Sequence, residues 1–295
     1  PHGMYQSVYD YPFLSSSANH IFDITVGVAS NSGLYNTSNT QAAKKKNIYN
    51  QMAQILVGYD ATGTVMQFDQ DGDLTGGDKY KDVIIMPFSR LLVKDEIKKG
   101  TFSMTLGVNV LYKDATPYTS TIDITDSDGS DQYYVNSPVG EYGILYAEDS
   151  AGAEMSGEIK KVGLIYYQAG IVVLTKDILT DTVLVGGADL QLASAGTLAD
   201  TLLTDSTIEA FADGLRNRIT NIQFNNTTEL NSTIYFCRAN HGEFNYSTNP
   251  TYVDGSKIRV KTNSTDEPIA YITSIGLYND KNELMATAKL SEPLK

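Results

Sequence analysis

Apolar and polar positions alternate in many short segments of this chain, and a period of two is typical of β-strands. The clearest example is residues 271–278. Its odd positions would share one face: Tyr271, Thr273, Ile275 and Leu277. Its even positions would share the other face: Ile272, Ser274, Gly276 and Tyr278. The turn-forming residues 279–282 separate this run from a second apolar run that ends at Leu290, so the sequence predicts a β-hairpin with one buried face.

Most of the remaining chain also has the pattern of strands separated by turns. Candidate strands cover residues 20–28, 83–86, 102–110, 118–124 and 141–146. Residues 162–167 and 171–175 flank a short Gln-Ala-Gly turn and predict a tight hairpin. Because both of its strands are almost continuously apolar, this hairpin is either buried on both faces or part of a subunit contact.

Two segments change to a helical period. Residues 41–57 carry a stripe of apolar side chains, and Gly58 is placed to end the helix. Residues 206–220 begin with Ser206 and Glu209, which have the spacing of a capping box. The following apolar residues would form one face: Ile208, Phe211, Ala212, Leu215 and Ile219.

The predicted fold is therefore mainly β, with an antiparallel sandwich or barrel-like sheets and two amphipathic helices, because strands do not alternate with helices. Residues 1–190 would form a β-rich domain with one helix, and residues 191–205 a linker. Residues 206–295 would form a C-terminal module of one helix and the hairpin. The alternative is a single continuous domain.

Charge and cysteine content limit the classes of partner. The formal net charge of −13 repels phosphate backbones and disfavours nucleic-acid binding. The basic cluster Lys44–Lys46 has the pattern of a solvated helix face. No run of about eighteen apolar residues is present, so no membrane span is expected. The single cysteine, Cys237, excludes an internal disulfide and follows an apolar run that predicts a buried thiol.

The sequence offers little for catalysis. It lacks a Gly-x-Ser-x-Gly elbow, a phosphate-binding Gly-rich loop and a dinucleotide fingerprint. Its three histidines are scattered and none forms the i, i+4 pair of a zinc-binding helix. We therefore identify no catalytic residue and no organic cofactor site, and we expect a protein that is not an enzyme.

One acidic segment is a candidate calcium site. Its carboxylates follow the alternation that hard cations favour: Asp69, Asp71 and Asp73, with Asp78 nearby. The calcium-binding loop template has glycine at its sixth position and glutamate at its twelfth, where this chain has Leu74 and Tyr80. Asp and Gly also form tight turns without any metal, so a plain turn is the competing interpretation.

The C-terminal segment resembles a known family. Residues 272–290 read I-T-S-I-G-L-Y-N-D-K-N-E-L-M-A-T-A-K-L, which resembles a hairpin of tail-fibre and baseplate-associated proteins of tailed bacteriophages. Residues 11–20, 224–230 and 244–250 are similar to stretches of virion structural proteins from marine contractile-tailed phages. The resemblance implies a virion component and brings no catalytic residues with it.

Such a protein would be located in the virion and would bind copies of itself, as a symmetric homo-oligomer, and other virion proteins. The tail, baseplate or fibre region is the expected position, and a neck, collar or capsid-decorating role is the variant. A receptor-binding adhesin that recognises a host surface glycan is the alternative from another class. Tyrosine combines a large apolar area with a polar tip, which suits interfaces. The candidate interface residues are Tyr166, Tyr167, Tyr271, Ile275, Leu277 and Tyr278.

Overall fold

A computed structural model describes most of the chain, in two compact units that comprise residues 1–230 and 231–295. The described residues are 3–10, 18–108, 118, 120–149, 152, 161–181, 184, 191–193, 197–230, 234–240, 249–251, 253–255, 257–258, 265 and 271–294. The fold is mainly β, as the sequence predicted. The parts 109–110 and 119 of the predicted strands and the parts 11–17 and 244–248 of the resemblance segments lie outside the described residues.

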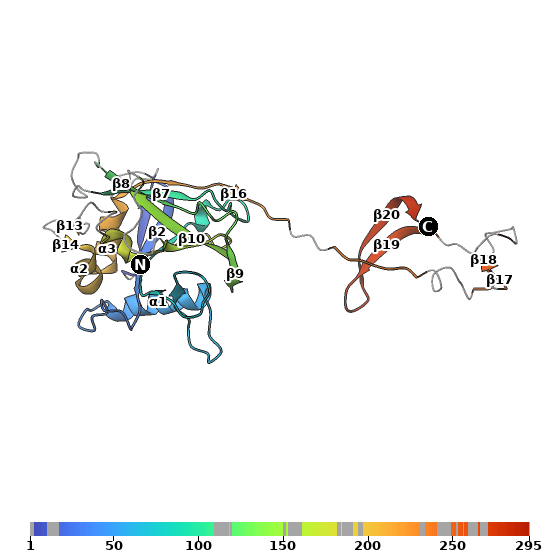
Figure 1. The fold of residues 1–295 in the computed structure, drawn as a ribbon, viewed down its shortest axis with the longest axis horizontal. Helices are drawn as coiled ribbons and strands as arrows, with labels where there is room; N and C mark the ends of the chain where they lie inside the picture. Colours follow the sequence, from blue (N-terminus) through green and yellow to red (C-terminus); the bar gives the residue numbers. More distant parts are fainter. Residues whose placement is uncertain are drawn as a thin grey trace. The chain divides into compact units, whose positions relative to one another are not determined.

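The first unit is built on a curled antiparallel sheet of ten strands (Figure 1). The strands lie in the order β1 (Gln6–Tyr9), β2 (His20–Val28), β5 (Asp82–Pro87), β12 (Ile171–Thr175), β11 (Lys161–Tyr166), β10 (Gly140–Asp149), β8 (Ser120–Thr125), β7 (Ser103–Val108) and β15 (Ile219–Gln223), with β9 (Tyr134–Ser137) also paired to β10. The curling gives the sheet a concave face that side chains fill, which agrees with the barrel-like prediction.

Short ladders complete the two units. In the first unit they are β3 (Phe68–Asp69) with β4 (Lys79–Tyr80), β6 (Glu96–Ile97) with β16 (Asn226–Thr227), and β13 (Gln191–Ala193) with β14 (Thr197–Leu198). Two short 3₁₀ turns, η1 (Ser89–Leu91) and η2 (Lys176–Leu179), follow strands β5 and β12. In the second unit the ladders are β17 (Val253–Asp254) with β18 (Lys257–Ile258), and β19 (Ile272–Tyr278) with β20 (Leu284–Leu294).

The predicted hairpin of residues 162–175 forms the centre of the core. Strands β11 and β12 pair with Ile165 opposite Val172, and both side chains are fully buried. Tyr166 and Tyr167 are also buried, at 1% and 0% exposure. The prediction that these two tyrosines belong to an interface is therefore wrong: they pack inside the first unit, because this hairpin has neighbouring strands on both sides.

Helix α1 (Ala42–Leu56) packs directly on strand β2. A Cβ atom at Gly27 would lie 2.9 Å from the Cα of Tyr49, so glycine is needed for the helix to approach this closely. The Tyr49 hydroxyl donates a hydrogen bond of 2.7 Å to the Tyr80 carbonyl. Gly58, at φ +95°, donates its N–H to the Ala53 carbonyl and ends the helix as predicted.

The basic cluster Lys44–Lys46 is not a fully solvated face. Lys45 is only 2% exposed, and its ammonium donates hydrogen bonds to the carbonyls of Leu203 and Ser206 at the C-terminal end of helix α2 (Ala199–Asp205). Burial lowers the pKa of Lys45 to about 8. The lysine joins two helices because it satisfies carbonyl groups that have no partner within α2.

The second predicted helix is observed as α3 (Ile208–Arg216). Its cap is one residue later than predicted: the Thr207 hydroxyl accepts the Ala210 N–H at 3.1 Å, whereas Ser206 precedes the cap. Glu209 consequently lies in the first turn and not at the capping-box position. Four residues of the predicted apolar face are buried: Ile208, Phe211, Ala212 and Leu215. The helix ends before the predicted residue 220, and the fifth residue, Ile219, is half-buried and begins strand β15.

The segment 191–205, which the sequence suggested as a linker, contains helix α2 and belongs to the first unit. Leu202 and Leu203 are buried at 3% and 1% exposure, so this helix contributes to the core. The chain instead divides after Leu230, and helix α3 lies with the β-rich unit and not with the C-terminal hairpin.

Candidate interaction surface

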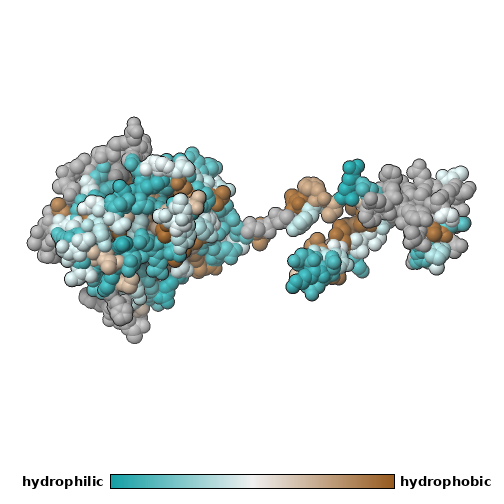
Figure 2. All heavy atoms as spheres, turned by 90° about the horizontal axis from the view of Figure 1, so that it is seen from below, coloured by the Kyte–Doolittle hydropathy of each residue, from teal (hydrophilic) through white to brown (hydrophobic). Residues whose placement is uncertain are grey.

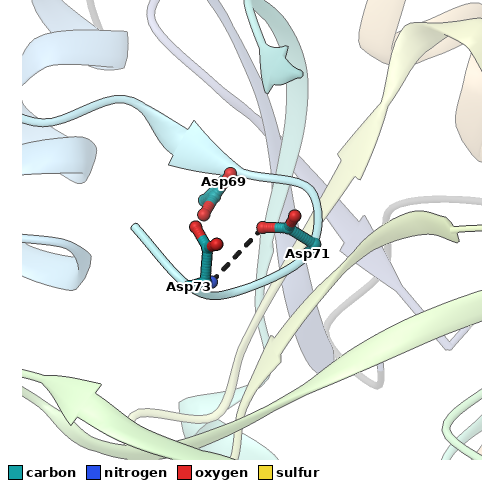
Figure 3. Close-up of side chains that lie close together, drawn as sticks. All are labelled: Asp69, Asp71 and Asp73. Atoms are coloured by element: carbon teal, nitrogen blue, oxygen red, sulfur yellow. Dashed lines mark hydrogen bonds between the residues drawn. The ribbon is translucent and has the colours of Figure 1, made fainter. Parts of the chain in front are cut away.

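The acidic loop between β3 and β4 brings three of the four predicted metal ligands together. Carboxylate oxygens of Asp69, Asp71 and Asp73 lie within 4.8 Å of one another (Figure 3). The Asp73 N–H also donates a hydrogen bond of 3.3 Å to the Asp71 carboxylate. Asp78 is exposed and lies outside this group. Three oxygens at this spacing offer part of a shell for a hard cation.

The chain itself already provides a cation for this loop. The Lys79 ammonium lies 2.6 Å from one carboxylate oxygen of Asp69, and the Leu74 N–H donates a 2.6 Å hydrogen bond to the other. Asp69 is 1% exposed, and burial raises its pKa, although the bonds from Lys79 and Leu74 act in the opposite direction. Calcium binding remains a prediction, and Lys79 would compete with it for Asp69.

The backbone of the loop is held by strands β9 and β10. Gly72, at φ +82°, lies so close to the Tyr134 ring that a Cβ atom would approach it to 2.8 Å. Its carbonyl accepts hydrogen bonds from Asn136 at 2.9 Å and from the Tyr142 hydroxyl at 3.1 Å. Leu74 adopts φ +61°, the conformation that glycine provides in calcium loops, although its side chain makes this conformation less favourable.

A second acidic cluster surrounds Lys99. The carboxylate oxygens of Glu96, Glu141 and Glu229 converge within 4.8 Å of one another. The Lys99 ammonium lies 3.4 Å from Glu96 and 2.9 Å from Glu229, and it also contacts Glu141. Burial by itself would lower the pKa of Lys99, but the hydrogen bonds to Glu141 and Glu229 outweigh it and raise the pKa.

This second cluster fastens the end of the first unit. Glu229 lies two residues after strand β16, which pairs with β6, and the Lys98 N–H donates a 2.7 Å hydrogen bond to the Asn225 carbonyl. Two aromatic rings lie beside the ammonium, with centroids 4.9 and 5.6 Å away: those of Tyr133 and Tyr167. Lys99 therefore anchors the chain immediately before it leaves for the second unit.

Asp126 is a buried carboxylate that organises backbone. It is 1% exposed, and its two oxygens accept hydrogen bonds of 2.8 Å from the Gly100 and Phe102 N–H groups. Burial raises the pKa of Asp126 to about 6, although these hydrogen bonds favour the charged form. Its role is to satisfy donors that would otherwise be buried without a partner.

A small cavity of about 120 Å³ lies on the β9–β11 part of the sheet. It is lined by Asp128, Gln132, Tyr134, Ile144, Tyr146 and Lys161. Hydrogen-bonding groups and aromatic surface are thus combined in one small space. This combination suits a compact ligand with several hydroxyl groups.

The C-terminal segment forms the predicted hairpin. Strands β19 and β20 pair with Ile275 opposite Ala288 and with Leu277 opposite Ala286. The turn is the predicted one: the Asn279 side-chain oxygen accepts the Lys281 and Glu283 N–H groups, each at 2.9 Å. Asn282 has φ +60°, a conformation that asparagine tolerates better than most residues.

The predicted burial of one hairpin face is not seen among the described residues of the second unit. The described residues of both strands are exposed or half-buried. Ile275 and Leu277 are 48% and 52% exposed, and Tyr271 and Tyr278 are 58% and 63% exposed. The physical reason is that no described element of the second unit forms another layer over the hairpin.

A further apolar stretch precedes the hairpin and is also exposed. Ile234, Tyr235 and Phe236 are 76%, 74% and 94% exposed. Cys237 is exposed as well, which contradicts the predicted buried thiol. Figure 2 shows hydrophobic surface in brown on the second unit. Four of the six predicted interface residues, those in the hairpin, therefore lie on an open surface.

Comparisons with family models, curated proteins and solved structures find no match for this chain. Within the described residues, no helix combines the length and apolarity that a membrane crossing requires.

Lys79→Met tests whether the lysine neutralises the acidic loop. The substitution leaves the buried Asp69 carboxylate without its cation, so we expect a loss of about 3 kcal/mol in the free energy of unfolding. Urea denaturation measures it. The double variant Asp69→Asn, Lys79→Met carries no uncompensated charge and should lose less than Lys79→Met alone. A double variant as unstable as the single one would contradict this role.

Asp126 should make the stability depend on pH. Its folded pKa of about 6 lies above the ordinary value of 3.8, so the protonated form is favoured by folding. This contribution is fully present below about pH 4 and is lost as the pH rises to about 6, a decline of about 3 kcal/mol. Denaturation of wild type and Asp126→Asn between these pH values measures the difference. Equal slopes for the two proteins would refute the assignment.

Proposed function

We propose that this chain is a structural component of a tailed-phage virion that works by docking to other proteins, without a catalytic step. The observation that carries the proposal is the uncovered apolar surface of the second unit. An isolated two-stranded hairpin is marginally stable in water, and exposed apolar patches commonly mark interaction sites. A partner that covers the hairpin would both stabilise it and remove its apolar side chains from water.

The family resemblance falls on the same segment as the exposed apolar surface. Residues 272–290 are the stretch that resembles tail-fibre and baseplate-associated proteins, and among the described residues of the second unit no layer covers their apolar side chains. The proposed location is the virion, in the tail, baseplate or fibre region. A neck, collar or capsid-decorating position is a variant of the same assembly role.

The acidic clusters agree with a structural role. Lys79 contacts the buried carboxylate of the first cluster, and Lys99 contacts all three carboxylates of the second. A catalytic carboxylate pair needs access to substrate, whereas Asp69 and Glu96 are each 1% exposed. We therefore assign these groups to the fold, and we propose other virion proteins as the partners.

Peptide mass spectrometry of purified phage particles tests the proposal. We expect peptides from both units in the particle, at a constant ratio to another virion protein through successive purification steps. A non-structural phage protein serves as the control and should be depleted. Absence of the chain from infectious particles, despite its abundance in the lysate, would remove the proposed function.

A glycan-binding adhesin is the second candidate, and the cavity on the sheet favours it. Tyr134 and Tyr146 offer aromatic surface, and Asp128, Gln132 and Lys161 offer hydrogen-bonding groups. If the cavity binds host glycans, a glycan array should give signals for wild type that Tyr146→Ala loses. Tyr59→Ala, at an exposed site elsewhere, is the matched control. Silence of the folded wild-type protein would eliminate this candidate.

A further inference from the structure

We propose that a second copy of this chain covers the apolar face of the C-terminal hairpin. The two hairpins would pack face to face around a two-fold axis parallel to their strands. The inference specifies the partner of the surface described above and rests on the proposed assembly function. It follows from the side chains that share each face, from their sizes and from the distribution of charge.

The strand register separates the hairpin into two different faces. Ile275 with Ala288, and Leu277 with Ala286, are opposite pairs whose side chains share one face, which is wholly apolar at these positions. The two central pairs on the other face combine polar and small residues, Ser274 with Lys289 and Gly276 with Thr287, whereas the pairs at its ends are apolar, Ile272 with Leu294 and Tyr278 with Leu284. An apolar face of this kind normally packs against a second layer.

The apolar face is also shaped to fit itself. The large side chains, Ile275 and Leu277, stand on β19, and the small ones, Ala286 and Ala288, lie opposite them on β20. At these two pairs the face therefore has a ridge on β19 and a groove on β20. A two-fold axis parallel to the strands places β19 of one copy over β20 of the next, so each ridge enters the groove of its partner.

The charge distribution favours association of copies through this module. Residues 231–295 contain seven Lys or Arg and seven Asp or Glu, so their net charge is zero. The whole formal charge of −13 therefore belongs to residues 1–230. Two first units repel each other, whereas two C-terminal modules meet without net repulsion. A basic partner, in contrast, would be attracted to the first unit and not to this face.

Analytical ultracentrifugation of the full-length chain tests the inference, at concentrations up to about 100 μM. We expect a species of twice the 32.2 kDa mass of the chain. Leu277→Lys, which places a charge on the apolar face, should weaken association by about tenfold or more. Thr287→Lys adds the same charge to the opposite face of the same hairpin and should associate as wild type does.

A size exchange provides a second test that instability alone would not mimic. Ile275→Ala with Leu277→Ala removes the ridge and should weaken association. Adding Ala286→Leu and Ala288→Ile moves the ridge to β20, where the same axis again pairs it with a groove, so association should recover.

A monomer at all concentrations would overturn the inference. An oligomer that Leu277→Lys does not weaken, or that the size exchange does not restore, would also overturn it. These results are distinguishable from failure of the proposed function. If the chain is a monomer but is found at a constant ratio in particles, the proposed assembly function stands and the partner is a different protein. If the chain is a dimer but is missing from particles, the self-association stands and the proposed function fails.

Discussion

Burial of apolar sheet faces is the constraint on which this structure depends. In the first unit the sheet curls so that its own strands enclose the core, and helix α1 covers β2 closely enough to require glycine at Gly27. Each strand of the β11–β12 hairpin has a neighbour on its other side as well. The C-terminal hairpin alternates instead of being continuously apolar, and no described strand lies beside it. The two hairpins therefore differ both in strand pattern and in their described surroundings.

The two acidic clusters of the first unit share one arrangement. In each, a buried carboxylate lies near two more exposed ones and contacts a lysine: Lys79 contacts Asp69, and Lys99 contacts Glu96 together with two further glutamates. A buried carboxylate costs free energy unless it is paired, so these contacts allow acidic residues close to the core. The same arrangement places a lysine in the acidic loop that the sequence marks as a candidate calcium site, where calcium binding remains a prediction.

The sequence predicted those features that depend on local period and turn chemistry. The hairpins at residues 162–175 and 271–290 and the helices α1 and α3 follow from alternation, from helical stripes and from turn residues. Burial set by distant contacts could not be predicted. Lys45 is buried because it reaches carbonyls of residues 203 and 206, and Tyr166 because other strands flank its own. Cys237 follows an apolar run that no described element covers.

The exposed hairpin shows why burial cannot be predicted from the local sequence pattern alone. If both faces of the C-terminal hairpin remained in contact with water, Ile275 and Leu277 would add no stability on one face. Polar residues at these positions would make the hairpin more soluble. At the two central pairs the large side chains nevertheless stand on β19 and the small ones on β20, and the module has no net charge although the rest of the chain carries −13. The alternation predicts one buried face, and this face is exposed among the described residues of the second unit. We propose that the layer that buries it belongs to another molecule.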